Sequence, residues 1–316
     1  MRGIVTLVTG SWHDIRLEDG STLPCRIAGK LRMDDIRTTN PVGVGDEVEV
    51  QYETGDDTRG VISEVLPRRN YIVRQSPRRK HDLHLLASNV DQAVLVTTII
   101  QPTLKMGFID RFILMTEPHN IPVIIVINKF DLFSEEEKEM FGGLQYMYED
   151  IGYQVLGVSA LTGEGMDTLK ELLKDKVTLV AGQSGVGKST LVNAIQPGLG
   201  LKTDEISDYS GKGQHTTTFA QMFPLDMGGY IIDTPGIKML SFNNLEPMDV
   251  AHNFKEFFKA SVGCRFPNCL HRNEPGCAVK SAVEEGTISL MRYEHYLQII
   301  GEIEDQNYWE RHKDLK

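Results

Sequence analysis

The fold is decided by the stretch Val177-Thr-Leu-Val-Ala-Gly-Gln-Ser-Gly-Val-Gly-Lys-Ser-Thr190, in which an apolar β-branched run enters the spacing G-x-x-x-x-G-K-S. A helical pattern follows, so the motif has the strand, loop and helix that a phosphate-binding loop requires. Its glycines let successive backbone N–H groups face one concavity at a helix N-terminus, which suits a polyphosphate better than a plain glycine-rich turn would. The expected nucleotide contacts are Gly182, Gln183, Ser184, Gly185, Val186, Gly187, Lys188, Ser189 and Thr190.

Several side chains around this loop are assigned to phosphate and metal chemistry. Lys188 is expected to reach the β- and γ-phosphates and to assist catalysis, and the Ser189 hydroxyl to bind the bridging Mg²⁺. Downstream, an apolar strand ends in Asp233-Thr-Pro-Gly236. Asp233 is suited to hold a Mg²⁺-bound water, and the Gly236 N–H to meet the γ-phosphate. In the polar stretch between these motifs, Thr217 is the expected third Mg²⁺ ligand, with the register open by one residue.

Two further loops follow buried strands and fit a guanine base. The carboxylate of Asp131, in Asn128-Lys-Phe-Asp131, can accept both N–H donors of the Watson–Crick edge of guanine, whereas adenine would leave it unpaired. Asn128 is expected to hold the base and tie neighbouring loops together, and the Lys129 stem to cover the ring. Ser159-Ala160 offers a backbone N–H to the guanine oxygen. Each loop alone also fits an ordinary surface loop, but all the motifs together predict GTP.

The order of these loops differs from that of ordinary small G proteins, in which the phosphate loop comes first. Here Asn128 and Ser159 precede Gly182. Buried strands alternate with helices from about residue 85 to 240, which predicts a parallel sheet with its ligand at the carboxyl ends of the strands. Joining the old termini and cutting elsewhere keeps every loop at that edge. We therefore expect a central circularly permuted P-loop GTPase over 73–245.

The residue that orients the attacking water is harder to identify. Many G proteins use a glutamine after the D-x-x-G turn, but Ile237 occupies that position and can neither donate nor accept a hydrogen bond. His215 is a candidate because a neutral imidazole can accept a proton or orient water. A switch-loop histidine without a chemical role is the alternative. Slow intrinsic hydrolysis, accelerated by a partner, is the corresponding expectation.

The first 72 residues predict an OB-like β-barrel. They contain five short alternating runs: 3–8, 14–17, 23–27, 46–52 and 60–65. Such barrels often bind RNA, but stacking aromatics are few here, so a docking surface for protein is the alternative. The basic segment 67–81 has no clear periodicity and is interpreted as an interdomain linker, either in contact with RNA phosphate or simply solvated.

Residues 246–316 predict a helical domain around a metal. Cys264, Cys269, His271 and Cys277 have the spacing C-x4-C-x-H-x5-C. Three thiolates and one imidazole fill a tetrahedral Zn²⁺ shell and leave no position for water, so the site should be structural. Buried thiols with an incidental histidine are the alternative. Helical spacing over 290–309 predicts a mostly buried stripe, while Arg272, Lys280 and Arg292 are candidates for an exposed edge that contacts RNA or protein.

Composition limits the class of protein. The chain has 316 residues, 41% of them hydrophobic, and a formal net charge of −11, which argues against a nonspecific nucleic-acid coat and leaves local RNA binding open. It has no apolar run of the roughly 20 residues needed to cross a bilayer and no signal-peptide pattern. We therefore expect a cytoplasmic, multidomain protein of mixed β and α/β class, with no membrane partner.

The motifs together resemble the RsgA/YjeQ family of circularly permuted GTPases that depend on the small ribosomal subunit. The resemblance spans essentially the whole chain and includes Ala87-Ser-Asn-Val-Asp91 and Gly213-Gln-His-Thr-Thr-Thr218 beside the motifs above. It implies an OB domain, a permuted GTPase and a zinc domain, acting on the small subunit and its rRNA late in maturation. Gln214 and Phe219 depart from the arginine and histidine common in the family, which leaves the switch-loop chemistry open.

The sequence therefore predicts a GTPase, expected to be a monomer, that binds the small ribosomal subunit with GTP, hydrolyses it to GDP and phosphate, and is then released. The alternative is a nucleotide-regulated module for RNA or protein binding in which turnover is incidental, a reading that Ile237 favours. Stimulation of phosphate release by purified small subunits separates the two.

Overall fold

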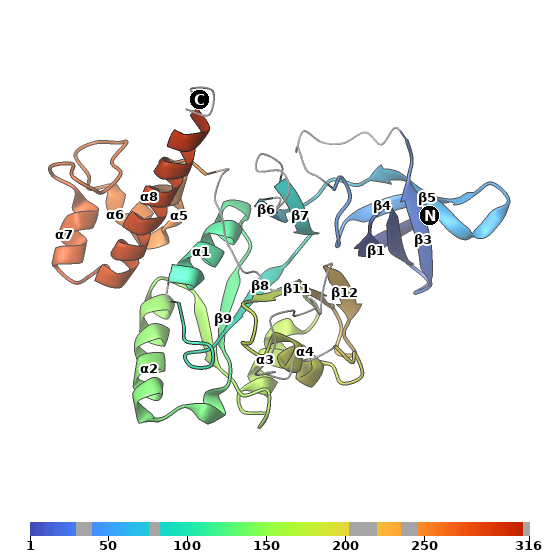
Figure 1. The fold of residues 1–316 in the computed structure, drawn as a ribbon, viewed down its shortest axis with the longest axis horizontal. Coiled ribbons are helices and arrows are strands. Elements are labelled where there is room, and N and C mark those ends of the chain that lie inside the picture. The colour runs from blue at the N-terminus through green and yellow to red at the C-terminus, as the bar shows by residue number, and fades with distance from the viewer. Residues whose placement is uncertain (30–39, 76–82, 106, 202–219, 235–244, 312–316) are drawn as a thin grey trace.

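The computed structural model describes residues 1–29, 40–75, 83–105, 107–201, 220–234 and 245–311, without the side chains of 74, 75 and 306–311. The N-terminal barrel and the C-terminal helices lie on opposite sides of a central α/β unit (Figure 1). None of the described helices is long and apolar enough to cross a membrane.

Five strands form the N-terminal barrel. They are β1 (Arg2–Thr9), β2 (Trp12–Leu17), β3 (Thr22–Ile27), β4 (Glu47–Glu53) and β5 (Asp56–Val65). Their order is β1-β2-β3-β5-β4, and β1 also pairs with β4, so the sheet closes on itself. Alternate side chains point inward and form a small apolar core that includes Val5, Ile15 and Ile62. Cys25 is buried in this core. The barrel expected from the sequence is confirmed.

The basic segment after the barrel is not only a linker, which corrects the sequence interpretation. Strand β6 (Tyr71–Gln75) pairs antiparallel with β7 (Leu83–Ser88) to make a separate two-stranded sheet. Ile72 and Val73 are buried, and this burial places the segment against the body of the protein. The strand was not predicted because Ile72 and Val73 are its only strongly apolar residues and arginines flank them on both sides. Residues 76–81 of the segment lie outside the described residues.

The central sheet has the order β10-β9-β8-β11-β13-β12. Its strands are β8 (Gln92–Thr97), β9 (Val123–Ile127), β10 (Gln154–Gly157), β11 (Val177–Gly182), β12 (Gln221–Pro224) and β13 (Tyr230–Asp233). All pair in parallel except β12, which runs antiparallel to β13. Along the sequence, β8, β9 and β10 come first and form one half of the sheet. Strand β11 comes later and pairs with the other edge of β8. This is the permuted order that the motifs predicted.

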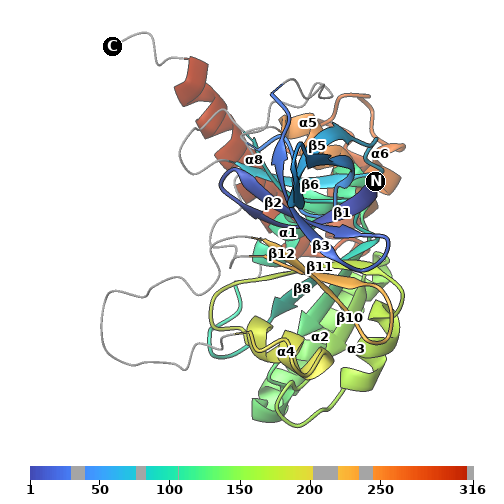
Figure 2. The same ribbon diagram turned by 90° about the vertical axis from the view of Figure 1, so that its right-hand side faces the viewer.

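Helices cover both faces of this sheet. Helices α1 (Gly107–Thr116) and α2 (Glu135–Asp150) belong to one hydrophobic cluster with Leu95 and Ile125, and helices α3 (Met166–Leu173) and α4 (Lys188–Ile195) belong to another with Val94 and Val96. Because neighbouring residues of a strand face opposite sides, the continuous apolar strands serve both clusters. Short 3₁₀ turns at Glu117–His119 and Phe130–Leu132 complete the unit. In the view of Figure 2, the barrel lies above α3 and α4.

The barrel and the central sheet are joined at one edge. Leu7 of β1 pairs with Gln221 of β12, which makes one continuous sheet of 11 strands. Strand β12 was not expected from the sequence, since its four residues carry no periodic pattern. The barrel strand β1 therefore covers the outer edge of the nucleotide-binding unit.

Four helices form the C-terminal region: α5 (Pro247–Asn253), α6 (Lys255–Ser261), α7 (Ala278–Glu284) and α8 (Leu290–Arg311). Phe254, Phe257 and Tyr296 share the hydrophobic cluster of α1 and α2, so the two regions are packed as one body. The predicted stripe on the last helix is confirmed, with Tyr296, Ile300 and Ile303 buried.

The expected exposed basic edge is wrong for Arg292. Its side chain is 1% exposed and pairs with Asp110 of α1 at 2.5 Å and with Glu256 of α6 at 2.8 Å. Arg272 pairs with Glu304 at 2.9 Å and is partly buried. Carboxylates from distant parts of the chain neutralise the charge of the buried guanidinium. A local sequence pattern cannot predict such partners.

Candidate functional site

The phosphate loop lies between β11 and α4 at the carboxyl edge of the sheet. Gly185 and Gly187 have φ angles of +84° and +85°, in the left-handed region that favours glycine. A Cβ at Gly187 would collide with the Asn128 side chain, so glycine is also required there for space. Gln183 and Ser184 belong to the loop, whereas Lys188, Ser189 and Thr190 form the first turn of α4. The predicted strand, loop and helix are all present.

The Lys188 amine is held within the site. Lys188 is 8% exposed, and its Nζ donates hydrogen bonds to the Asp233 carboxylate and, at 2.7 Å, to the Thr234 carbonyl. The Thr234 hydroxyl in turn donates to the Val180 carbonyl at 3.0 Å. Two motifs 45 residues apart in the sequence thus meet at one point.

Asn128 joins the base loops to the phosphate loop. Its Nδ2 donates to the Val186 carbonyl at 2.9 Å, and its Oδ1 accepts the Ala160 N–H at 3.1 Å. The side chain is buried, so its amide needs hydrogen-bond partners within the protein, and backbone groups of two other loops provide them at both ends. The linking role expected for Asn128 from the sequence corresponds to these contacts.

Lys129 and Asp131 lie at the open side of the same edge. The Lys129 Nζ donates to the carbonyls of Gln101 at 2.6 Å and Gly185 at 2.8 Å. Desolvation lowers the pKa of Lys129 despite the attraction of Asp131. One oxygen of Asp131 accepts the Ser159 hydroxyl at 2.5 Å, which fixes the carboxylate. Sequence reasoning missed Gln101, because a backbone carbonyl has no side-chain signal.

Three predicted positions fall outside the described residues: Thr217, Gly236 and His215. The third Mg²⁺ ligand, the γ-phosphate contact and the catalytic histidine therefore stay predictions. Gln214 and Phe219, which depart from the family pattern, also lie outside the described residues. Within the described residues, the structure brings together Lys188, Asp233 and the start of α4.

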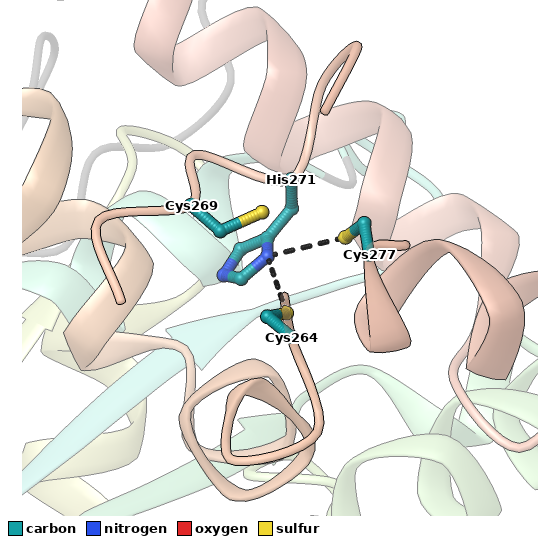
Figure 3. A group of neighbouring side chains, drawn as sticks. All are labelled: Cys264, Cys269, His271 and Cys277. Carbon is teal, nitrogen blue, oxygen red and sulfur yellow. Dashed lines mark hydrogen bonds between the residues drawn. The ribbon is translucent and has the colours of Figure 1, made fainter. Parts of the chain in front are cut away.

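The four metal-ligand candidates converge in the loop between α6 and α7. The ligand atoms of Cys264, Cys269, His271 and Cys277 all lie within 4.8 Å of one another (Figure 3). The His271 Nδ1 is 3.7 Å from the Cys264 Sγ and 3.4 Å from the Cys277 Sγ. Zinc bonds of about 2.3 Å to sulfur and about 2.0 Å to nitrogen place tetrahedral ligands at such separations. The donor set and its spacing therefore fit a metal ion.

Neighbouring groups hold this loop in shape. The hydroxyls of Tyr293 and Tyr296 donate to the carbonyls of His271 at 2.7 Å and Leu270 at 2.8 Å. Glu274 accepts the Leu270 and Arg272 N–H groups, both at 2.8 Å. Burial raises the pKa of the Cys269 thiol to about 12 and lowers the pKa of His271.

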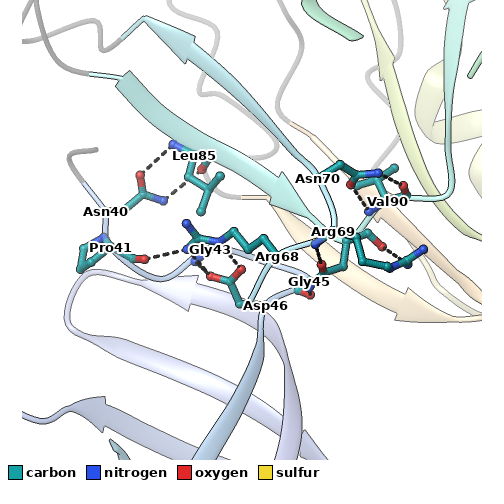
Figure 4. A network of polar contacts seen from close by, with 11 residues as sticks. Asn40, Pro41, Gly43, Gly45, Asp46, Arg68, Arg69, Asn70, Leu85 and Val90 are labelled. Carbon is teal, nitrogen blue, oxygen red and sulfur yellow. Dashed lines mark hydrogen bonds and ion pairs between the residues drawn. The ribbon is translucent and has the colours of Figure 1, made fainter. Parts of the chain in front are cut away.

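A second polar network lies where the barrel meets the central unit (Figure 4). Arg68 donates to both oxygens of the fully buried Asp46 at 2.7 Å, and to the Pro41 carbonyl at 2.8 Å. Asn89 donates to the Gly45 carbonyl and accepts the Arg69 N–H, each at 2.9 Å. The barrel is therefore fixed by polar contacts on both sides of the segment interpreted from sequence as a linker.

Asp91 extends the network to the strand that carries the phosphate loop. Its Oδ2 accepts the Val177 N–H at 2.8 Å, and its Oδ1 accepts from Arg69 at 3.0 Å. The stretch Ala87–Asp91, which contributed to the family resemblance, thus has a structural position between barrel and sheet. It lies at the opposite end of β11 from Gly182.

Comparison with protein families gives two matches. A model described as RsgA GTPase matches residues 65–243, and one described as RsgA N-terminal domain matches residues 2–62. Among curated proteins, the small ribosomal subunit biogenesis GTPase RsgA of Bacteroides fragilis is 47% identical over 308 residues, or 98% of this chain and 99% of its own. That of Flavobacterium psychrophilum is 46% identical over 311 residues, or 98% and 94%.

Two solved structures are similar along nearly the whole chain. YjeQ from Thermotoga maritima has a TM-score of 0.77 and 37% identity, and the match covers 96% of this chain and 98% of that one. YloQ, described as a circularly permuted GTPase, has a TM-score of 0.72 and 31% identity over 96% and 95%.

Proposed function

The chain belongs to the RsgA family of GTPases, and from this premise we propose that it binds the small ribosomal subunit and hydrolyses GTP to GDP and phosphate late in the maturation of that subunit. The observation that carries the proposal is the Asn128 amide, which joins the phosphate loop to the base loops across a permuted sheet. Every motif of a guanine nucleotide site that the structure describes therefore lies at one sheet edge.

Guanine selection rests on Asp131. Its carboxylate accepts the two N–H donors of the base edge, and the Ser159 hydroxyl at 2.5 Å holds the carboxylate in position. The loop of Ser159 and Ala160 lies beside the base in this proposal, with the Ala160 N–H bonded to the Asn128 Oδ1 at 3.1 Å, and the Lys129 stem covers the ring between Gln101 and Gly185.

Phosphate binding rests on the loop Gly182–Thr190. Lys188 neutralises the β- and γ-phosphates, and its contact with Asp233 places that carboxylate beside them. Mg²⁺, when bound with GTP, supplies charge neutralisation of the developing transition state. In this proposal, Ser189 and Asp233 supply oxygen ligands to the ion and Thr217 completes the set, while the Gly236 N–H contacts the γ-phosphate.

The metal of the Cys₃His cluster is proposed to be Zn²⁺ with a structural role. All four positions of a tetrahedral shell are taken by protein atoms, which leaves none for a reacting water. When bound, the ion crosslinks the loop between α6 and α7 and so stiffens the surface offered to the small subunit.

Coupling between nucleotide and partner follows from the permutation. Asp233 ends β13, and the next described helix, α5, begins at Pro247 in the C-terminal region. Because few residues separate the predicted γ-phosphate contact from α5, a change in that contact can be transmitted to the C-terminal region along the backbone. In this proposal the chain has three domains: an OB-like domain (1–72), the GTPase (73–245) and the zinc domain (246–316). The protein acts as a monomer in the cytoplasm, and its barrel contacts rRNA.

The test is phosphate release by the full-length protein with and without purified small subunits. We expect strong stimulation, abolished by Lys188→Ala. Sedimentation with small subunits should be greater with a non-hydrolysable GTP analogue than with GDP. Equal rates with and without subunits, together with equal sedimentation in both nucleotides, would refute the proposal and favour a binding module with incidental turnover.

A further inference from the structure

A groove of about 1030 Å³ lies between helix α2 of the GTPase unit and the start of α8, and its lining contains no residue of the phosphate loop. Helix α2 forms one wall, the loop after β8 another, and the turn before α8 the third. The volume is at the upper end of the range for small-molecule pockets. Its floor is apolar and is formed by Ile100, Leu104, Met140, Leu144, Met147 and Ile288.

Three methionines line this groove beside Tyr146, which is 76% exposed. Met140 is 48% exposed, and Met147 and Met291 are half-buried. Methionine is flexible and polarisable, and it is frequent where a surface must adapt to the apolar face of a partner helix. Gly143 adds an open position in the middle of α2, because a Cβ built there meets nothing within 4 Å. Another helix can approach α2 closely at this point.

The rim of the groove is acidic. Glu136 and Asp150 are exposed at the two ends of α2, and Glu137 and Glu256 also line the groove. The basic side chain in the lining is Arg292, which is buried and paired with Asp110 and Glu256. A phosphate backbone would be repelled here, whereas lysines and arginines flanking an apolar stripe would be attracted.

The groove shares a loop with the nucleotide site. Ile99 and Ile100 line the groove, and the next residue, Gln101, accepts the Lys129 Nζ at 2.6 Å. The Ile100 carbonyl accepts the Thr98 hydroxyl at 2.7 Å, and the Leu104 N–H donates to the Ile99 carbonyl at 3.1 Å, so the loop is internally braced. An occupant in contact with this loop also acts on the side chain that covers the base.

We propose that the groove binds a basic amphipathic helix of a protein partner, and that its occupancy slows GDP release. The apolar face of the partner helix lies on the methionine-rich floor of the groove, and the lysines and arginines that flank this face pair with Glu136 and Asp150. Contact with the loop after β8 holds Gln101 in place and so keeps Lys129 over the base. This interaction goes beyond the proposed function, and it requires no small subunit.

The probe is a synthetic peptide helix with leucines at i, i+4, i+7 and i+11 and lysines elsewhere, labelled with a fluorophore and added to the full-length protein with bound GDP. Controls are a peptide with the same composition but dispersed leucines, a peptide with glutamates in place of lysines, and a short RNA hairpin. Fluorescence anisotropy measures binding. Release of a fluorescent GDP analogue, with and without saturating peptide, measures coupling.

Two neighbouring glycines give a matched pair of variants. Gly143→Trp fills the groove, and Gly142→Trp adds the same side chain one residue away, at a position that also has open space and does not line the groove. We expect Gly143→Trp to weaken peptide binding by at least about tenfold and Gly142→Trp to match wild type. Unchanged melting temperature and basal GTP hydrolysis in both variants show that the fold is intact.

Charge is tested with a second matched pair. Glu136→Gln with Asp150→Asn should weaken binding several-fold and flatten its salt dependence, whereas Glu139→Gln with Glu149→Gln, on the same helix but outside the groove, should not. Equal binding by Gly143→Trp and Gly142→Trp, equal affinity for the glutamate peptide, or Gly143-dependent binding of the RNA hairpin would overturn the choice of occupant. An unchanged GDP release rate at saturating peptide would overturn the coupling.

Discussion

Asp131 determines the choice of base in the proposed site. Replacing it by asparagine removes one charged acceptor and presents an N–H donor to the donors of guanine, so we expect Asp131→Asn to bind a fluorescent GDP analogue about a hundredfold more weakly. The same amide can pair with xanthine, in which a carbonyl replaces the guanine amino group. Xanthosine diphosphate should therefore regain most of the lost affinity.

The matched control is Asp57→Asn, an exposed carboxylate in the barrel. It should bind GDP as wild type does. If Asp131→Asn kept its affinity for GDP, or lost affinity for both nucleotides equally, the assignment of base reading to this carboxylate would be wrong.

His215 is the candidate for orienting the attacking water. We expect His215→Ala to keep GDP affinity and to lose most of the phosphate release stimulated by small subunits, since general-base or water-orienting groups typically contribute about 10²–10⁴-fold. His215→Gln, which can still accept a hydrogen bond, should retain more activity. A stimulated rate equal to wild type in His215→Ala would exclude the catalytic role.

The zinc ion proposed for the Cys₃His cluster is expected to stabilise the loop that joins α6 and α7. Cys269→Ser removes one of four ligands, and the remaining three cannot close a tetrahedral shell, so metal binding should fall steeply. We expect native mass spectrometry to show loss of about one zinc per chain and thermal unfolding to begin several degrees lower. Strong chelation of wild type should reproduce both effects.

Cys25→Ser is the control for that experiment, since this thiol lies in the barrel core, far from the cluster. It should keep the metal in full. Wild-type protein that carries no metal under native conditions would contradict the assignment.

The ion pairs between α1, α6 and α8 hold the C-terminal helices on the GTPase unit. Burial opposes ionisation of Asp110, but Arg292 and His295 outweigh it and keep the pKa of Asp110 below its usual value. Arg292→Met removes the guanidinium shared by the buried carboxylates of Asp110 and Glu256, although Asp110 keeps its contacts with His295 and Tyr148. We expect a loss of about 3–5 kcal/mol in the free energy of unfolding, measured with urea. Arg272→Met, which breaks a more exposed pair, should lose much less.

Acid titration gives an independent check of the same pair. Because the pKa of Asp110 is lowered on folding, its contribution is fully present above the ordinary value of about 3.9 and is lost as the pH falls through the lower value in the folded state. Wild type should therefore lose stability over that acidic interval. Arg292→Met should lose less there, and parallel curves for the two proteins would argue against the pair.

Elements with local signals were predictable from the sequence, and elements that depend on distant partners were not. The phosphate loop from Gly182 to Ser189 carries its glycines, lysine and flanks in one stretch, so its position was predicted closely. Strand β6 was missed because only Ile72 and Val73 mark it, and its partner β7 lies beyond a further segment. Arg292 was misplaced for the same reason, since its compensating charges come from α1 and α6.

At the scale of the whole molecule, the contacts around Asp46 fix the barrel to the central unit. Arg68→Met leaves a fully buried carboxylate unpaired, and we expect a loss of about 3–5 kcal/mol in barrel stability. Barrel and GTPase should then unfold in separate transitions. GDP affinity should stay close to wild type, while binding to small subunits weakens.

Arg2→Met is the matched control, because Arg2 and Glu49 form an exposed pair at 3.5 Å on the same barrel. Its effect should stay within about 1 kcal/mol. A single cooperative transition in Arg68→Met, at the same denaturant concentration as wild type, would show that the junction does not hold the barrel in place.

During translation, the strands of the permuted sheet leave the ribosome in an order that differs from their order in space. Strands β8, β9 and β10 emerge first, and one edge of β8 stays unpaired until Val177 begins β11. An apolar strand with an open edge is a template for pairing with other chains. Nascent or truncated chains that end before Val177 should therefore aggregate, whereas chains that include β11 have that edge closed.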